Sequence, residues 1–326
     1  MQETITMSGS SSTPTSQACP NASTVVILRE APGGFEVFMV QRHAKSRFMA
    51  DRFVYPGGKL DAADCTARAA ERIDGRSAAE IQAAFGESSL QCSAQNAEQA
   101  ADAYLGSGLF LAGIRETFEE AGILLARRSG ERGLIDLTSD AAVAKRFRVH
   151  RQQLNRNTLA LSALAEQEDL IFPLERIAYF AHWITPFHEP KRYDTRFFIA
   201  LAPENQRPLH DHEETTDSTW IRPKDAIAAN QAGNFLLAPP TLHTLLQLCE
   251  FDTARAAFDW AIAHHPPTII PHMKMHEDAV FLLLPGDPQY PGDQPGYDAT
   301  SPVRGATRMR AENIGLWRMI EDEDAP

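Results

Sequence analysis

The stretch that decides the fold of this 326-residue chain runs from Gly113 to Ile123 and reads GIRETFEEAGI. An α-helix turns about 100° per residue, so Glu116, Glu119 and Glu120 place their carboxylates on one arc roughly 100° wide. Like charges at this spacing destabilise an isolated helix by roughly 0.2–0.5 kcal/mol. A divalent cation among the three carboxylates would remove that repulsion, and hard oxygen ligands favour Mg²⁺ or Mn²⁺.

The opposite side of the same helix is apolar and can face a core. Gly122 suits the left-handed residue that ends a helix. A solvated helix face, with Arg115 paired to Glu119 at i, i+4, would also explain the charges, so the carboxylates alone do not decide the function. The residues expected to face the core are Leu111, Ile114, Phe118 and Ala121.

A second stretch supplies the context that the helix needs. Residues Pro56 to Asp64 read PGGKLDAAD, which places a Pro-Gly-Gly turn before an acid. Together the two stretches resemble the two halves of the Nudix box, a glycine, five residues and an acid, then R-E-U-x-E-E-x-G-U with U apolar. Asp64 stands where the family usually has Glu, and Thr117 is a soft match at the first U.

The box is split, because residues 65 to 114 separate its halves where the family usually has seven residues. Such a split is similar to the branch that contains the mammalian peroxisomal coenzyme A diphosphatase. We expect residues 65–107 to form a helical insertion that loops away while Gly58 and Glu119 meet at one site. Three later segments of this chain also resemble that branch: HWITP at 182–186, RYDTRFF at 192–198 and APPT at 238–241.

The resemblance implies an α/β fold, the Nudix α/β/α sandwich with a mixed sheet, extended by the helical insertion and by a C-terminal extension. We expect a disordered tail at 1–23, a Nudix domain at 24–250 and an extension at 251–326 packed on the core. The expected strands and helices follow from periodicity and turn residues. Strands are expected at 24–28, 35–41, 53–55, 177–185, 193–201, 268–273, 279–284 and 307–320. Helices are expected at 77–85, 94–105, 108–121, 223–233, 239–248 and 253–263, with two more within 138–168.

The resemblance also implies roles for individual residues in a metal site. It places metal on the carbonyl of Gly58 and on the carboxylates of Glu116, Glu119 and Glu120. Arg115 is expected to orient the glutamates through charge-assisted hydrogen bonds.

The general base is left open by the sequence. Family members use either the glutamate after the box Arg, here Glu116, or an acid in a distal loop, here Glu213 or Glu214. Glu214 is preferred because it lies six residues before Trp220.

The basic loop that begins at Arg42 could contact phosphate or could equally be a solvated connection, and the turn glycine Gly57 is a second candidate for substrate contact. Arg192 is a third candidate, although it could equally pair with Asp194.

The amino-acid composition limits the kinds of binding partner and the cellular setting that we expect for this chain. Forty-three acids against 31 bases give a net charge of −12, which argues against nucleic acid as a partner but not against a small nucleotide. Four scattered cysteines favour a reducing, cytoplasmic setting over disulfides or zinc. No apolar run of about 18 residues is present, so no membrane partner is expected, and a homodimer is allowed.

The function predicted from these observations is metal-dependent hydrolysis of the pyrophosphate bond in a nucleoside diphosphate linked to another moiety, with Mg²⁺ or Mn²⁺ as cofactor. Within the resemblance, coenzyme A or acyl-coenzyme A is the first substrate expected. An ADP-ribose or NADH pyrophosphatase is the alternative. A binding module without turnover is a further alternative, although such modules typically lose box glutamates, and all are present here.

Overall fold

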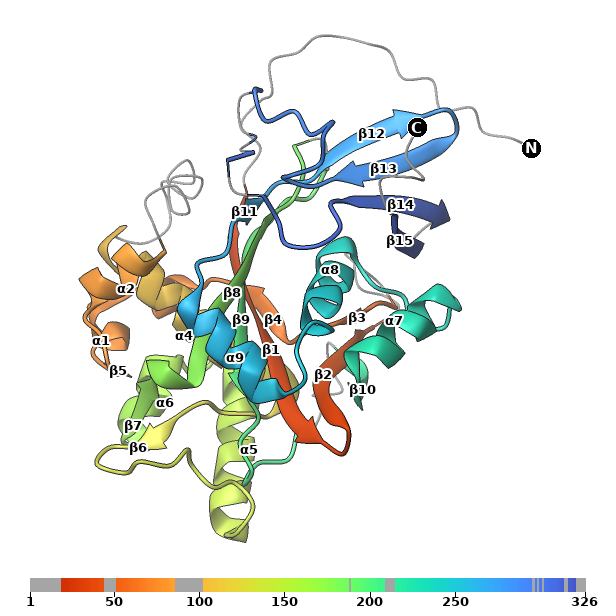
Figure 1. The fold of residues 1–326 in the computed structure, drawn as a ribbon. Coiled ribbons are helices and arrows are strands. Elements are labelled where there is room, and N and C mark those ends of the chain that lie inside the picture. Colours follow the sequence, from red (N-terminus) through yellow and green to blue (C-terminus); the bar gives the residue numbers. More distant parts are fainter. Residues whose placement is uncertain are drawn as a thin grey trace.

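The computed structural model describes residues 19–43, 51–85, 102–187, 189–208, 215–294, 297, 299–300, 302–313 and 316–320. A mixed β-sheet with strand order β10-β2-β1-β9-β8-β11 forms the centre of the fold (Figure 1). The predicted hairpin is confirmed as an antiparallel β1–β2 pair, whereas β1 and β9 run parallel. The strands are β1 (Asn21–Ala31), β2 (Gly34–Arg42), β8 (Ile177–Ile184), β9 (Asp194–Leu201), β10 (Thr215–Ile221) and β11 (Thr268–Ile269), with β3 (Phe53–Val54) beside β2 and β4 (Gly57–Lys59) beside β1.

Both faces of this sheet are buried, as strand β1 shows. Val25 and Ile27 belong to one apolar cluster, and Val26 and Leu28 belong to the other. Alternate side chains of a strand point to opposite faces, so helices must cover both sides. One face carries α2 (Ala78–Ala84), α4 (Leu105–Ala121), α5 (Ala141–Asn155) and α6 (Leu161–Gln167), and the other carries α7 (Pro223–Gln231), α8 (Pro239–Leu248) and α9 (Ala254–Ala263).

The α/β/α sandwich is therefore confirmed. None of the helices in the described part of the chain is long and apolar enough to cross a bilayer.

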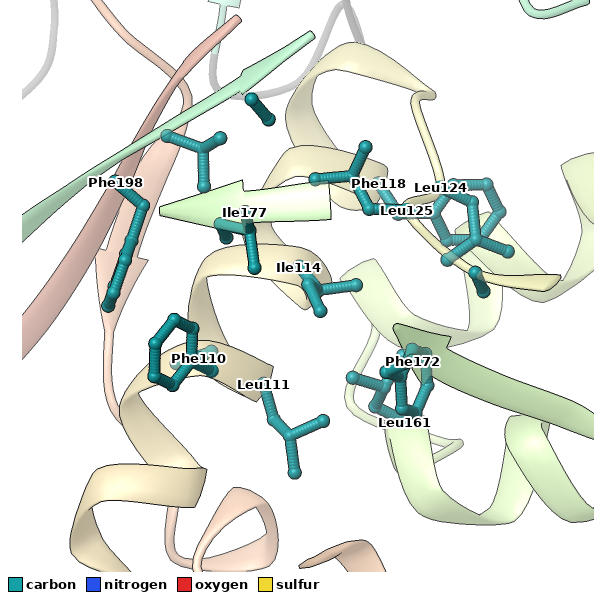
Figure 2. Close-up of a cluster of buried hydrophobic side chains, with 14 of the residues drawn as sticks. Phe110, Leu111, Ile114, Phe118, Leu124, Leu125, Leu161, Phe172, Ile177 and Phe198 are labelled. Atoms are coloured by element: carbon teal, nitrogen blue, oxygen red, sulfur yellow. The ribbon is translucent and has the colours of Figure 1, made fainter. Parts of the chain in front are cut away.

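Helix α4 lies at the centre of the first cluster, and Figure 2 shows its apolar side. The predicted core face is confirmed, with Leu111, Ile114 and Phe118 all buried. The helix approaches the sheet closely, because a Cβ added at Gly113 would stand 3.1 Å from Cγ2 of Val25. The helix ends where the sequence predicted, at Gly122 with φ 69°.

The described part of the insertion packs on the first half of α4. The helix predicted at 77–85 is α2, which begins with a capping box between Ser77 and Glu80. Its C-cap residue Phe85 lies 5.4 Å from Phe110, ring centroid to centroid. The other helix, predicted at 94–105, lies largely outside the described residues, and α4 starts at Leu105, earlier than predicted. Shorter elements here are η1 (Ala62–Asp64), α1 (Ala67–Ala70), β5 (Ile73–Asp74) and η2 (Asp102–Tyr104).

A small three-stranded sheet, two of whose strands come between α4 and β8 in the sequence, was not predicted. Its strands are β6 (Arg127–Arg128) and β7 (Leu170–Pro173), with β5 pairing on the other side of β7, and η3 (Leu174–Arg176) follows. The two helices expected within 138–168 are confirmed as α5 and α6.

The strand predicted at 268–273 is wrong as a single element. Pro271 has no N–H to donate and separates β11, in the central sheet, from β12 in a second sheet. That second sheet has the order β12-β13-β14-β15 and lies beyond α8, at the top of Figure 1. Asn230 of α7 donates to the carbonyl of Trp317 at 3.3 Å. The strands are β12 (His272–His276), β13 (Ala279–Leu283), β14 (Arg308–Asn313) and β15 (Leu316–Ile320).

Candidate active site

Arg115 lies at the centre of the polar side of α4. Its Nη1 donates to Oε1 of Glu116 at 2.8 Å and to Oε2 of Glu119 at 3.1 Å. All three side chains are only 12–14% exposed, so these bonds form largely away from water. The predicted orienting contacts between Arg115 and the glutamates are therefore present in the structure.

The same guanidinium joins the two halves of the box. Its Nη2 donates to the carbonyl of Lys59 at 2.8 Å and to Oδ2 of buried Asp64 at 3.1 Å. Asp64, the acid that replaces the usual Glu, also accepts from the Asp61 N–H and so completes a capping box at the start of η1. The insertion thus leaves the two halves in contact, as expected.

The two glycines of the Pro-Gly-Gly turn lie so close to neighbouring atoms that a side chain at either position would collide with them. A Cβ added at Gly57 would stand 2.5 Å from the carbonyl oxygen of Ser23, and one added at Gly58 would stand 2.5 Å from the carboxylate carbon of Glu116. The N–H of Gly57 donates to Oε2 of Glu120 at 3.0 Å. Absence of side chains therefore lets the turn lie directly against the glutamates.

Burial and crowding change the acidity of the cluster. Burial raises the pKa of Glu119 to about 7; Arg115 opposes the rise, while Glu116 and Asp64 add to it. Burial also raises the pKa of Asp64, again against Arg115. Burial alone would lower the pKa of Arg115, but Glu116, Asp64 and Glu119 raise it above its usual range. The cluster therefore holds more negative charge than one guanidinium neutralises.

Arg151 supports the end of the box helix and was missed by the sequence analysis. From α5, its Nε donates to the carbonyl of Glu119 at 2.8 Å. Such a bond satisfies a carbonyl in the last turn of α4 and places a positive charge at the negative end of the helix. No local sequence signal marks this contact, because it depends on how α5 packs against α4.

The cluster opens into a cavity of about 1100 Å³. Its lining includes Glu116, Glu119 and Glu120 together with Gly57 and Gly58. Residues from the matched segments at 182–186, 192–198 and 238–241 also line it, and they include Trp183, Thr195, Pro239 and Thr241.

The candidates for substrate contact fall differently around this cavity. Arg42 lines it, and its buried Nε has no hydrogen-bond partner within the described part of the chain. Arg192 does not line it, since its Nε donates to the carbonyl of Thr185 at 3.0 Å and its guanidinium lies 4.5 Å from the Phe187 ring centroid. The neighbouring Lys191 lines the cavity instead.

The distal acids Glu213 and Glu214 lie outside the described residues. The first described residue after them, Thr215, pairs with Arg42 across β10 and β2.

A mixed sheet between helix layers, with a glutamate-bearing helix held against a Pro-Gly-Gly turn, is the fold and site of a Nudix hydrolase. The sequence signature of the NUDT19 Nudix domain matches residues 4–248, so the chain belongs to this family.

Known relatives agree with this assignment. An acyl-coenzyme A diphosphatase NUDT19 from Gallus gallus is 26% identical over 325 residues, covering 90% of this chain and 85% of the relative. The protein of the same name from Xenopus laevis is 25% identical over 279 residues, covering 79% of this chain and 72% of the relative. The crystal structure of a NUDIX hydrolase from Alicyclobacillus acidocaldarius is similar with a TM-score of 0.59 and 26% identity, over 75% of this chain and 97% of that one.

Nudix hydrolases generally need a divalent metal ion, and the donor set here fits one. The crowded side chains of Glu116, Glu119 and Glu120 offer carboxylate oxygens, which are ligands for hard cations. Among the described residues, no three carboxylate, imidazole or thiolate groups already surround a common metal position. The oxygens of Glu116, Glu119 and Glu120 are instead bonded to Arg115 and to the Gly57 N–H.

Proposed function

We propose that this chain hydrolyses the pyrophosphate bond of coenzyme A or acyl-coenzyme A, giving an adenosine bisphosphate and a phosphopantetheine product. The proposal depends on the cavity of about 1100 Å³, whose lining includes both the box carboxylates and apolar side chains. Ligand cavities commonly span about 300–1,000 Å³, so this one has room for a substrate longer than a nucleoside diphosphate. The relatives named acyl-coenzyme A diphosphatase support the same substrate class.

The cation would be held by Glu116, Glu119, Glu120 and the carbonyl of Gly58. When bound, Mg²⁺ or Mn²⁺ would neutralise the diphosphate oxygens and lower the pKa of a bound water. Arg115 fixes the rotamers of Glu116 and Glu119 by two charge-assisted hydrogen bonds, so the ligands are oriented before substrate arrives.

The proton of the attacking water needs an acceptor, and two candidates remain. Glu116 is one, because it lines the cavity within the cluster. Glu214 is the other and rests on its spacing to Trp220. Each would act as a general base, a role worth about 10²–10⁴ in rate.

Phosphate groups need positive charge beside the metal. Arg42 and Lys191 line the cavity and are suited to this contact, whereas Arg192 is engaged elsewhere. Gly57 would approach the substrate through its backbone, because it carries no side chain. We also propose that the enzyme acts in a reducing compartment such as the cytoplasm, since Cys65 and Cys249 are free thiols.

A substrate panel tests the proposal. We expect kcat/KM under one Mg²⁺ or Mn²⁺ condition to be highest for coenzyme A or an acyl-coenzyme A, and lower for ADP-ribose and NADH. A tenfold advantage for ADP-ribose or NADH, about 1.4 kcal/mol of transition-state preference, would replace coenzyme A by the dinucleotide alternative. Tight binding of any of them without turnover would instead favour a binding module.

A further inference from the structure

The C-terminal sheet β12–β15 lines the active-site cavity as well as packing on the core. Met273 of β12, Leu282 of β13 and Trp317 of β15 all line the same cavity as the box glutamates. Leu282 is buried, while Met273 and Trp317 are only partly covered. The extension therefore contributes wall area to the site rather than a separate surface.

Strand register explains why these side chains share one face. Met273 pairs with Leu282, Leu282 pairs with Met309, and Met309 pairs with Met319. Directly paired residues point to the same face of a sheet, so these four form a continuous apolar row across the strands. Trp317 lies two residues before Met319 and so points the same way.

Within the part of the chain that the structure describes, the charged side chains that line the cavity all come from elements outside the C-terminal sheet. The carboxylates belong to α4, and the basic lining residues such as Arg42 and Lys59 come from β2 and β4. In the described residues, every lining side chain that the C-terminal sheet contributes is apolar. Pro239 and Pro240, at the start of α8, and Trp183 of β8 also line the cavity.

From this division we propose that the methionine-bearing face of the C-terminal sheet binds the acyl chain of an acyl-coenzyme A and sets a preference for it over free coenzyme A. The proposal rests on the proposed function and names the segment that recognises the far end of the substrate. The diphosphate must lie at the carboxylates, so the other end of a long substrate reaches the part of the cavity that offers apolar contact. Methionine is unbranched and adaptable, which suits chains of different length.

The expected signature is chain-length dependence in the wild-type enzyme. Each methylene buried against Met273 and Trp317 should raise kcat/KM about fourfold until this apolar surface is covered. We therefore expect octanoyl-coenzyme A to exceed acetyl-coenzyme A, and acetyl-coenzyme A to be close to free coenzyme A.

Two methionines on one strand provide a matched pair of variants. Met273 and Met275 point to the same face of β12, but Met275 is 67% exposed and does not line the cavity. We expect Met273→Ser to lower the ratio of kcat/KM for octanoyl-coenzyme A to that for free coenzyme A about tenfold, and Met275→Ser to leave this ratio at the wild-type value. Using a ratio within one variant removes any effect of partial unfolding, and Trp317→Ala provides a second test with the same expected direction.

The outcomes separate this inference from the function on which it rests. If the wild type cleaves coenzyme A and octanoyl-coenzyme A equally well, or if Met273→Ser and Trp317→Ala leave the ratio unchanged, the acyl site is overturned while the proposed function stands. If the wild type cleaves neither compound, the proposed function fails and the acyl site fails with it.

Discussion

Replacement of Gly58 by alanine should abolish most activity while leaving the fold intact. The added Cβ would stand 2.5 Å from the carboxylate carbon and from Oε1 of Glu116. The carboxylate would have to move by about 1 Å to reach an ordinary contact of 3.4 Å. A displacement of about 1 Å at a catalytic site costs about 10²-fold in rate, so kcat should fall by about that factor.

The neighbouring glycine gives a contrasting result. A Cβ at Gly57 would meet backbone, at 2.5 Å from the carbonyl oxygen of Ser23 and 2.7 Å from Cα of Thr24. Backbone cannot swing aside as a side chain can, so Gly57→Ala should force β4 away from β1 and cost about 1–3 kcal/mol of stability.

The assay is steady-state hydrolysis at saturating Mg²⁺ together with a thermal melt of each variant. Gly133→Ala is the control, because a Cβ there meets nothing within 4 Å, and it should match the wild type in both measurements. Wild-type kcat for Gly58→Ala would refute the reasoning, and so would a loss of activity that merely follows unfolding.

Three further predictions follow from the same structure. Glu119→Gln should keep the fold and lose nearly all activity, because it removes charge without volume; near-full activity at limiting Mg²⁺ would contradict the ligand assignment. Glu214→Gln should lower kcat about 10²–10⁴-fold, whereas a wild-type rate beside an inactive Glu116→Gln would move the base to the box helix. Burial lowers the pKa of His243 to about 4, so between pH 6.5 and 4 the unfolded state binds the proton and stability falls as pH falls. Over that window the free energy of unfolding of the wild type should fall by about 3 kcal/mol more than that of a His243→Phe variant. Urea unfolding of both proteins at pH 7 and at pH 4.5 measures this; if their free energies of unfolding differ by the same amount at both pH values, the prediction is wrong.

Much of the fold could be predicted because local patterns agree with the tertiary structure. The apolar positions of α4 repeat at helical spacing, and Gly122 ends the helix in the left-handed conformation expected of it. The small sheet of β5, β6 and β7 could not be predicted. Its strands are two to four residues long, and β5 and β7 pair across about a hundred residues of chain, as Ile73 with Phe172 shows. A strand of two to four residues is too short to show the alternation of apolar and polar residues by which strands are predicted.

The three carboxylates of the site could be predicted from their spacing on one helix. The residues that hold this helix in place from other parts of the chain could not. The sequence places Arg115 beside Glu119, yet only the fold brings Asp64 and Arg151 to the same helix. In the β8–β9 loop, the sequence offered Arg192 as a phosphate contact or as a partner of Asp194. The structure turns Arg192 to Phe187 and leaves Lys191 on the cavity wall, a choice that depends on tertiary packing.

Cleavage of coenzyme A at its pyrophosphate bond can be tested by mass analysis of the products after incubation of the full chain with coenzyme A and Mg²⁺. We expect an adenosine bisphosphate and phosphopantetheine, formed only with the metal and absent with Glu119→Gln. Dephosphorylated coenzyme A as product, or intact coenzyme A beside cleaved ADP-ribose or NADH, would contradict this expectation.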